Sequence, residues 1–332
     1  MPHRAVAGFA NTQKLILESI MEYIIEIENL SKDYETDFWR KKKVRAVDGL
    51  SLNVRPGQIF GFLGGNGAGK TTTIKILMSL LFPTSGSARI LGRDIADVLM
   101  HRLIGYCPEN PYFYDYLTAA ELMNYFGEIF GMSPSARKAK SEELLASVGL
   151  DEKDWNKQLR KFSKGMLQRV GLAQSLINDP EIVFMDEPMS GLDPMGRREV
   201  RDLIAGLREQ GKTVFMSTHI LSDVEALCDE VAILRKGKLA ATGRLDELLA
   251  QSSEKQTFEI ILKNVSADDF AGDIVGLSGV TLTESANSLS VRVPNEVAVE
   301  DVLRLARSKN GKLISVQSTK QSLEDFFTSD AG

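Results

Sequence analysis

The stretch GFLGGNGAGKTTT, residues 61–73, combines glycines with one lysine and three threonines. Glycines allow several backbone N–H groups to converge on one anion, because no Cβ blocks the approach and a positive φ costs little. A lysine adds a point charge, and a threonine hydroxyl is an oxygen ligand of the kind that Mg²⁺ accepts. The pattern G-x-x-x-x-G-K-[ST] therefore predicts a triphosphate site. The expected contacts come from Gly64, Gly65, Asn66, Gly67, Ala68, Gly69, Lys70, Thr71 and Thr72, with Thr71 also as a metal ligand.

The residues on either side of the glycines predict how the site is positioned. The apolar run 59–63 is typical of a buried strand, and Ile74, Ile76, Leu77 and Leu80 follow at helical spacing. The glycines then join a strand to a helix that begins at Lys70, and the positive end of that helix adds to the anion site. The alternative is a glycine-rich turn with a surface lysine, which the flanking strand and helix disfavour.

A second candidate lies in PEIVFMDEP, residues 180–188. The apolar run 182–185 suits a parallel strand that is buried on both faces, and it ends in Asp186 and Glu187. Two carboxylates at the carboxyl end of a buried strand are costly unless a ligand needs them, and ligand sites of open α/β sheets lie there. We expect Asp186 to hold Mg²⁺ and Glu187 to orient and deprotonate an attacking water. The alternative is an ordinary pair of helix-capping acids.

His219 closes another predicted strand, which runs through Val214 and Met216. A lone histidine is more often structural than catalytic. This one ends a buried strand at the predicted ligand edge, so we expect it to contact the γ-phosphate and the attacking water.

The run FSKGMLQRVGLAQSLINDPEIVFMDEP, read with the glycine motif, resembles the ATP-binding cassette (ABC) family, specifically the nucleotide-binding subunit of a transporter. By this resemblance, Asp193 within SGLDP belongs to the D-loop, His219 is the H-loop histidine, and Tyr34 stacks on adenine. Phe38 and Trp39 are rival stackers in a basic insert beside Tyr34. The residues that match the family's signature motif, usually LSGGQ, are Ser163, Lys164, Gly165 and Met166.

The chain departs from the family pattern at several of these positions. Gly65 stands where many members have proline, Lys164 replaces a signature glycine, and Met166 replaces the signature glutamine. Lys164 either strengthens ATP binding or points into solvent. Glu109 stands at the Q-loop glutamine, where a carboxylate is a harder Mg²⁺ ligand but repels phosphate.

The resemblance implies a fold and a mode of action. Two cassettes face head to tail as a homodimer, or as a heterodimer with a related chain, and each ATP with its Mg²⁺ lies between one P-loop and the partner's signature. The subunit would drive export through a separate integral membrane permease at the cytoplasmic face of the membrane, with aromatic residues 112–116 either at the permease contact or in the core. The rivals are a soluble ABC ATPase that acts on ribosomes or DNA, and a P-loop kinase.

The predicted fold class is α/β, a cassette with a parallel-sheet core, antiparallel β elements and a helical subdomain at about 94–168. The cassette spans 21–250 after residues 1–20, which are either a disordered extension or a misassigned start. An α+β ferredoxin-like domain spans 256–332 with the order βαββαβ. The net charge of −5 argues against a broad nucleic-acid surface, and the two distant cysteines suit a reducing compartment. No apolar run approaches the roughly 18 residues that a bilayer span needs.

Overall fold

The structure is a computed structural model that describes residues 21–35, 43–248, 257–267, 279–285 and 288–319. The chain divides into two units, Met1–Gly243 and Arg244–Gly332. The predictions for residues 1–20 and for Phe38 and Trp39 lie outside the described residues. The predicted domain limits stay predictions, because residues 249–256 are also outside.

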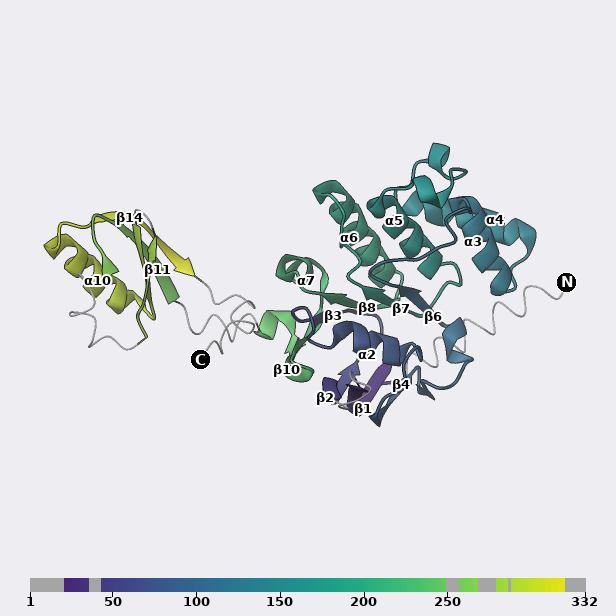
Figure 1. The fold of residues 1–332 in the computed structure, drawn as a ribbon, viewed down its shortest axis with the longest axis horizontal. Coiled ribbons are helices and arrows are strands. Elements are labelled where there is room, and N and C mark those ends of the chain that lie inside the picture. The colour runs from purple at the N-terminus through teal and green to yellow at the C-terminus, as the bar shows by residue number, and fades with distance from the viewer. Residues whose placement is uncertain (1–20, 36–42, 249–256, 268–278, 286–287, 320–332) are drawn as a thin grey trace. The chain divides into compact units, whose positions relative to one another are not determined.

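A six-stranded sheet in the order β10–β9–β3–β8–β7–β6 forms the centre of the first unit (Figure 1). Its strands are β3 (Ile59–Leu63), β6 (Ile104–Cys107), β7 (Ile182–Asp186), β8 (Thr213–Thr218), β9 (Glu230–Arg235) and β10 (Lys238–Arg244). The pairs β9–β3, β3–β8, β8–β7 and β7–β6 are parallel. Every residue of β3, β7 and β8 is buried, as their apolar runs predict. The carboxyl ends of parallel strands meet at one edge, which places the residues after Leu63, Met185 and Thr218 close together.

Four phenylalanines fill the centre of this sheet. The ring of Phe215 lies 5.5 Å from Phe60, 5.1 Å from Phe62 and 5.5 Å from Phe184, measured between centroids. Such aromatic contacts add about 0.5–1.5 kcal/mol each to the gain from burial alone. They hold β3, β8 and β7 in a fixed lateral order.

A smaller antiparallel sheet, β2–β1–β4–β5, packs on the other side of helix α2 (Lys70–Leu77). Its strands are β1 (Ile25–Glu35), β2 (Lys43–Val54), β4 (Ser85–Ile90) and β5 (Arg93–Asp94). One hydrophobic core joins Ile27 of β1, Ile74 of α2 and Phe60 of β3. In Figure 1, α2 faces this sheet, while α5 (Lys164–Ser175) and α6 (Pro194–Glu209) lie on the opposite side of the six-stranded sheet.

The helical region contains α3 (Ala119–Ile129), α4 (Pro134–Ser147) and short 3₁₀ turns at Met100–Arg102, Glu152–Asp154 and Leu159–Lys161. Thr118 and Glu121 form a capping box that begins α3. The sequence predicts a helical subdomain from about residue 94, but the structure has strand β6 within that region. A run of four residues is too short to distinguish a strand from a helix by periodicity, and pairing with β7 decides the outcome. Helix α7 (Leu221–Leu227) follows β8.

The second unit contains an antiparallel sheet in the order β12–β13–β11–β14, with α10 (Glu296–Ser308) packed on one face. Its strands are β11 (Thr257–Lys263), β12 (Thr281–Ser285), β13 (Ser288–Val293) and β14 (Lys312–Thr319). These are the four strands and the second helix of the predicted βαββαβ order. Most of the first helix, 267–277, lies outside the described residues, so the ferredoxin-like assignment stays a prediction.

Within the described residues, no helix has both the length and the apolar composition of a membrane span.

Candidate active site

The glycine loop joins β3 to α2 through a tight backbone path. A Cβ on Gly64 would lie 2.7 Å from the Leu234 carbonyl oxygen, and Gly69 has a φ of +106° with its Cβ position 2.4 Å from the Ala46 oxygen. Neither position tolerates a side chain, whereas Gly65 has open space around it. The loop therefore requires glycine at positions 64 and 69, whereas position 65 has room for a side chain.

The Lys70 side chain is buried at the start of α2. Its Nζ donates to the Gly64 carbonyl at 2.6 Å, and it lies 3.4 Å from Oε1 of Glu187. The second carboxylate oxygen, Oε2, lies 3.0 Å from Nδ1 of His219. The structure therefore brings three predicted site residues into one row, Lys70 from the glycine loop, Glu187 from the end of β7 and His219 from the end of β8.

Glu187 is held in an unusual backbone conformation. Its φ is +50°, in the left-handed region that costs a non-glycine residue roughly 1–3 kcal/mol. Its backbone N–H donates to the carbonyl oxygen of Ser217 at 3.1 Å and to its Oγ at 3.2 Å. The carboxylate is nearly buried, at 8% residue exposure, with a lysine and a histidine as its partners. A carboxylate placed in this way can accept a proton from a water molecule while the two neighbours keep it oriented.

Asp186 ends β7 beside Glu187 and is 1% exposed. The Ser217 hydroxyl donates to its Oδ1. Burial, and after it the Asp186 charge, raises the pKa of Cys107 to about 12 and raises the pKa of Tyr106 as well. A carboxylate buried this deeply is costly without a partner, and a bound cation would compensate its charge.

The residues present fit Mg²⁺ as that cation. A carboxylate at Asp186 and a hydroxyl at Thr71 are the oxygen donors that Mg²⁺ prefers, and it completes its shell with waters and phosphate oxygens. In the part of the chain that the structure describes, no group of three or more His, Cys, Asp or Glu side chains forms a metal site.

Tyr34 and Glu109 belong to two other parts of the cassette, β1 and the segment after β6. The Tyr34 hydroxyl lies 3.5 Å from Oγ1 of Thr72, and Nζ of Lys32 lies 5.5 Å from the centre of its ring. This places an aromatic side chain beside the start of α2, where the predicted adenine contact is needed. Glu109 is half-buried and follows β6, whose end is paired with Met185 next to Asp186.

The residues that we predict to form the signature lie at the start of α5. Ser163 is the N-cap, and its Oγ accepts from the N–H of Met166 at 3.2 Å. The Lys164 side chain is exposed at its end, and its methylene carbons pack on Gly191. Among the described residues, no hydrogen bond or ion pair joins this helix start to the row of Lys70, Glu187 and His219. Asp193, which the resemblance assigns to the D-loop, caps α6, where its Oδ1 accepts from the N–H of Gly196 at 2.8 Å.

Sequence reasoning missed Ser217, which touches both Asp186 and Glu187. The available signal was a serine at the end of a strand whose preceding residues, 214–216, are all apolar. A hydroxyl in such a strand needs an acceptor, and the neighbouring strand supplies the acidic pair.

A glycine loop between a parallel strand and a helix, with an acidic strand end beside its lysine, defines the class of P-loop nucleoside triphosphatases. Within that class, residues 47–190 match the family model described as ABC transporter. The chain is 43% identical over 310 residues to sll0415 of Synechocystis sp., an uncharacterized ABC transporter ATP-binding protein, covering 93% of this chain and 84% of that protein. It is 32% identical over 313 residues to the bacitracin transport ATP-binding protein BcrA of Enterococcus faecalis, covering 93% and 96%.

A solved structure agrees with these relatives. The dimeric post-hydrolysis state of the ATP-binding cassette MJ0796, bound to ADP and Pi, matches with a TM-score of 0.62 and 26% identity over 67% of this chain and 98% of that one. The chain therefore belongs to the ABC transporter family of ATP-binding proteins. The predicted α/β cassette fold is confirmed, and the protein is an ATPase that uses ATP with Mg²⁺. The relatives lend no support to a role on ribosomes or DNA.

Proposed function

We propose that this chain is the ATP-hydrolysing subunit of an exporter, and that it acts as a head-to-tail dimer on a separate membrane permease. The observation that carries this proposal is the Lys70–Glu187–His219 row, because it joins the phosphate-binding loop to a candidate base at one sheet edge. The bacitracin transport protein supports a transport role, and the dimeric cassette supports pairing of two copies.

In the proposed reaction, the backbone amides of residues 64–70 and the Lys70 ammonium bind the β- and γ-phosphates. Glu187 accepts a proton from the water that attacks the γ-phosphorus, and ADP leaves in line with it. His219 keeps the carboxylate oriented and contacts the γ-phosphate. Mg²⁺, held by Thr71 and Asp186, with Glu109 as a further candidate ligand, would neutralise charge on the phosphate oxygens.

The second copy would supply the remaining donors. Ser163 and Gly165 lie at the N-terminus of α5, where free amides and the helix dipole favour an anion. In the proposed dimer they contact the γ-phosphate bound by the partner's glycine loop, together with Lys164 and Met166 of the same motif. Asp193 would lie in the segment between the two sites, and Tyr34 would stack on adenine.

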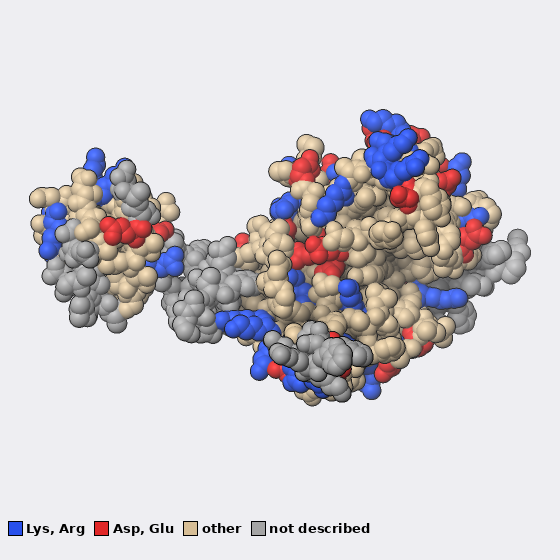
Figure 2. Space-filling view, in the orientation of Figure 1, with Lys and Arg blue, Asp and Glu red and all other residues tan. Residues whose placement is uncertain are grey.

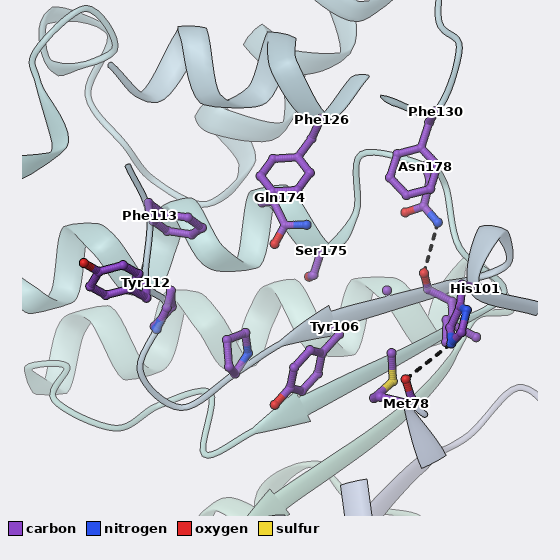
Figure 3. A pocket seen from close by; sticks show the side chains of 14 residues that line it. Met78, His101, Tyr106, Tyr112, Phe113, Phe126, Phe130, Gln174, Ser175 and Asn178 are labelled. Atoms are coloured by element: carbon purple, nitrogen blue, oxygen red, sulfur yellow. Dashed lines mark hydrogen bonds between the residues drawn. The ribbon is translucent and has the colours of Figure 1, made fainter. Parts of the chain in front are cut away.

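The permease contact is proposed at a pocket of about 320 Å³ between β6 and α3 (Figure 3). Aromatic side chains of Tyr106, Tyr112, Phe113, Phe126 and Phe130 line it. Tyr112 is 97% exposed, and Tyr114 and Tyr116 beside it are also exposed. Exposed aromatic side chains around a concave site are typical of a protein interface, so a helix from the cytoplasmic side of the permease is the proposed occupant. This placement puts the subunit at the cytoplasmic face of the membrane.

The charge distribution argues against nucleic acid as the partner. A nucleic-acid surface needs a broad array of unpaired lysines and arginines. On the face drawn in Figure 2, acidic and basic side chains lie among one another on the first unit. Many of the basic groups are paired, such as Arg201 with Asp223 and Arg208 with Asp229.

The test uses purified protein with ATP and Mg²⁺. Release of inorganic phosphate, together with a shift from monomer to dimer by light scattering in the Glu187→Gln variant, is the expected result. Transfer of phosphate to an acceptor without release of free phosphate would favour a kinase. Protein that stays monomeric with saturating ATP would contradict the head-to-tail arrangement.

A further inference from the structure

Helix α5 lies against both of the segments that leave the sheet next to the candidate base. On one side, a Cβ on Gly171 would lie 2.7 Å from Cγ of Pro111, in the segment after β6. On the other side, a Cβ on Gly165 would lie 3.3 Å from Cδ2 of Leu192, and a Cβ on Gly191 would lie 2.9 Å from Cδ of Lys164. The helix that starts with the signature is therefore in close contact with the segments after β6 and after β7.

Gln168 lies in α5 between these two contacts. It is fully buried, and its Nε2 donates to the carbonyl oxygen of Pro188 at 3.3 Å and approaches Sγ of Cys107 at 3.7 Å. Its Oε1 has no hydrogen-bond partner within the described structure. The Gln168 side chain provides one amide group that connects the ends of two strands.

Both connected points are close to groups with a proposed role. Pro188 directly follows Glu187, and Cys107 precedes Glu109 and the aromatic segment 112–116. The left-handed conformation of Glu187 requires support from outside the residue. Ser217 supports its N–H, and Gln168 supports the next peptide group through the Pro188 carbonyl.

We propose that Gln168 is a positioning residue for ATP hydrolysis. It holds the peptide after Glu187 so that the carboxylate stays directed between Lys70 and His219, and it ties this peptide to the end of β6. A shift of the segment after β6, as when a permease helix binds there, then moves the carboxylate. The inference rests on the proposed function, in which Glu187 is the base and residues 112–116 face the permease.

The main test replaces Gln168 by methionine, which has similar size and no N–H donor. A displacement of the base by about 1 Å can cost about a hundredfold in rate. We expect kcat to fall roughly ten- to a hundredfold while the KM for ATP stays within about twofold, because the phosphate-binding loop is untouched. Gln210→Met, at an exposed glutamine that ends α6, is the matched control and should behave as wild type.

Two further variants separate positioning from stability. Ile204→Val, in the buried face of α6, should lower the melting temperature and keep the wild-type kcat. Cys107→Ala removes the second acceptor of Gln168 and should lower kcat by about threefold, with no further fall when it is combined with Gln168→Met. This variant also tests the inference if Gln168→Met does not fold.

A wild-type kcat for Gln168→Met or for Cys107→Ala would overturn the inference. So would a double variant in which kcat falls by the product of the two single losses. A rise in KM with an unchanged kcat would do the same. Glu187→Gln is assayed in parallel. If that variant keeps wild-type turnover, the proposed base is wrong; if it is inactive while Gln168→Met is normal, only the role of Gln168 is wrong.

Discussion

Glu187→Gln is the substitution that tests the candidate base most directly. The change keeps the size of the side chain and removes one negative charge from a carboxylate that lies 3.4 Å from Nζ of Lys70 and 3.0 Å from Nδ1 of His219. The lysine keeps its bond to the Gly64 carbonyl at 2.6 Å, so the glycine loop should retain its geometry. General-base catalysis contributes about 10²–10⁴ in rate, which corresponds to roughly 2.7–5.4 kcal/mol of activation free energy. We expect kcat to fall within that range.

The affinity for ATP should rise in the Glu187→Gln variant, although kcat falls. The carboxylate repels the γ-phosphate, and two unit charges about 4 Å apart interact by at most about 4 kcal/mol at an effective dielectric constant of about 20. Even a quarter of that figure, about 1 kcal/mol, tightens ATP binding roughly fivefold. Phosphate release gives kcat, calorimetry gives the affinity, and light scattering gives the dimer fraction.

The control is Glu209→Gln, the same chemical change at the exposed end of α6. It should match the wild type in all three measurements. A Glu187→Gln protein whose kcat lies within about threefold of wild type would refute the assignment, because a lost general base costs at least about a hundredfold.

Lys70→Ala should weaken ATP binding at least about a hundredfold, since the only buried ammonium contributed by the glycine loop is lost; unchanged affinity by calorimetry would contradict the phosphate site. Tyr34→Ala should raise the Kd for ATP about five- to a hundredfold, because base stacking contributes about 1–3 kcal/mol, and an unchanged Kd would remove Tyr34 from the adenine site. In mixed dimers, Ser163→Arg in one copy should inactivate the site whose glycine loop belongs to the other copy, and full activity at both sites would exclude the head-to-tail arrangement. Burial raises the pKa of the Cys107 and Cys228 thiols, that of Cys107 to about 12, so at pH 8 neither should react with iodoacetamide until the protein is unfolded, as mass spectrometry can show.

The phosphate site was predictable because its parts are contiguous in the chain. The strand at 59–63, the glycines and the helix from Lys70 follow one another, so a local pattern contains the whole anion-binding loop. The apolar runs 182–185 and 214–216 were equally clear, because strands buried on both faces are continuously apolar. The family resemblance assigned Ser163 to the signature and Asp193 to the D-loop. It did not predict that these residues are the N-caps of α5 and α6.

Long-range pairing decided the rest. Sequence periodicity did not indicate that the short run 104–107 joins the sheet, because a segment of four residues fits either a strand or a helix turn. It also did not show that Ser217 bonds the acidic pair or that Gln168 connects the segments after β6 and β7. These contacts depend on which strands are neighbours.

By itself, the sequence determined the chemistry of this protein: a glycine loop with a lysine, an acidic pair and a histidine, each at the end of its own apolar strand. Only the tertiary structure decided their mutual geometry. The order β3–β8–β7 places residues separated by more than a hundred positions in the chain within hydrogen-bond reach of one another. The physical reason is that a local pattern specifies each strand and its end, whereas lateral strand order comes from side-chain packing between distant segments, here the contacts of Phe215 with Phe60, Phe62 and Phe184.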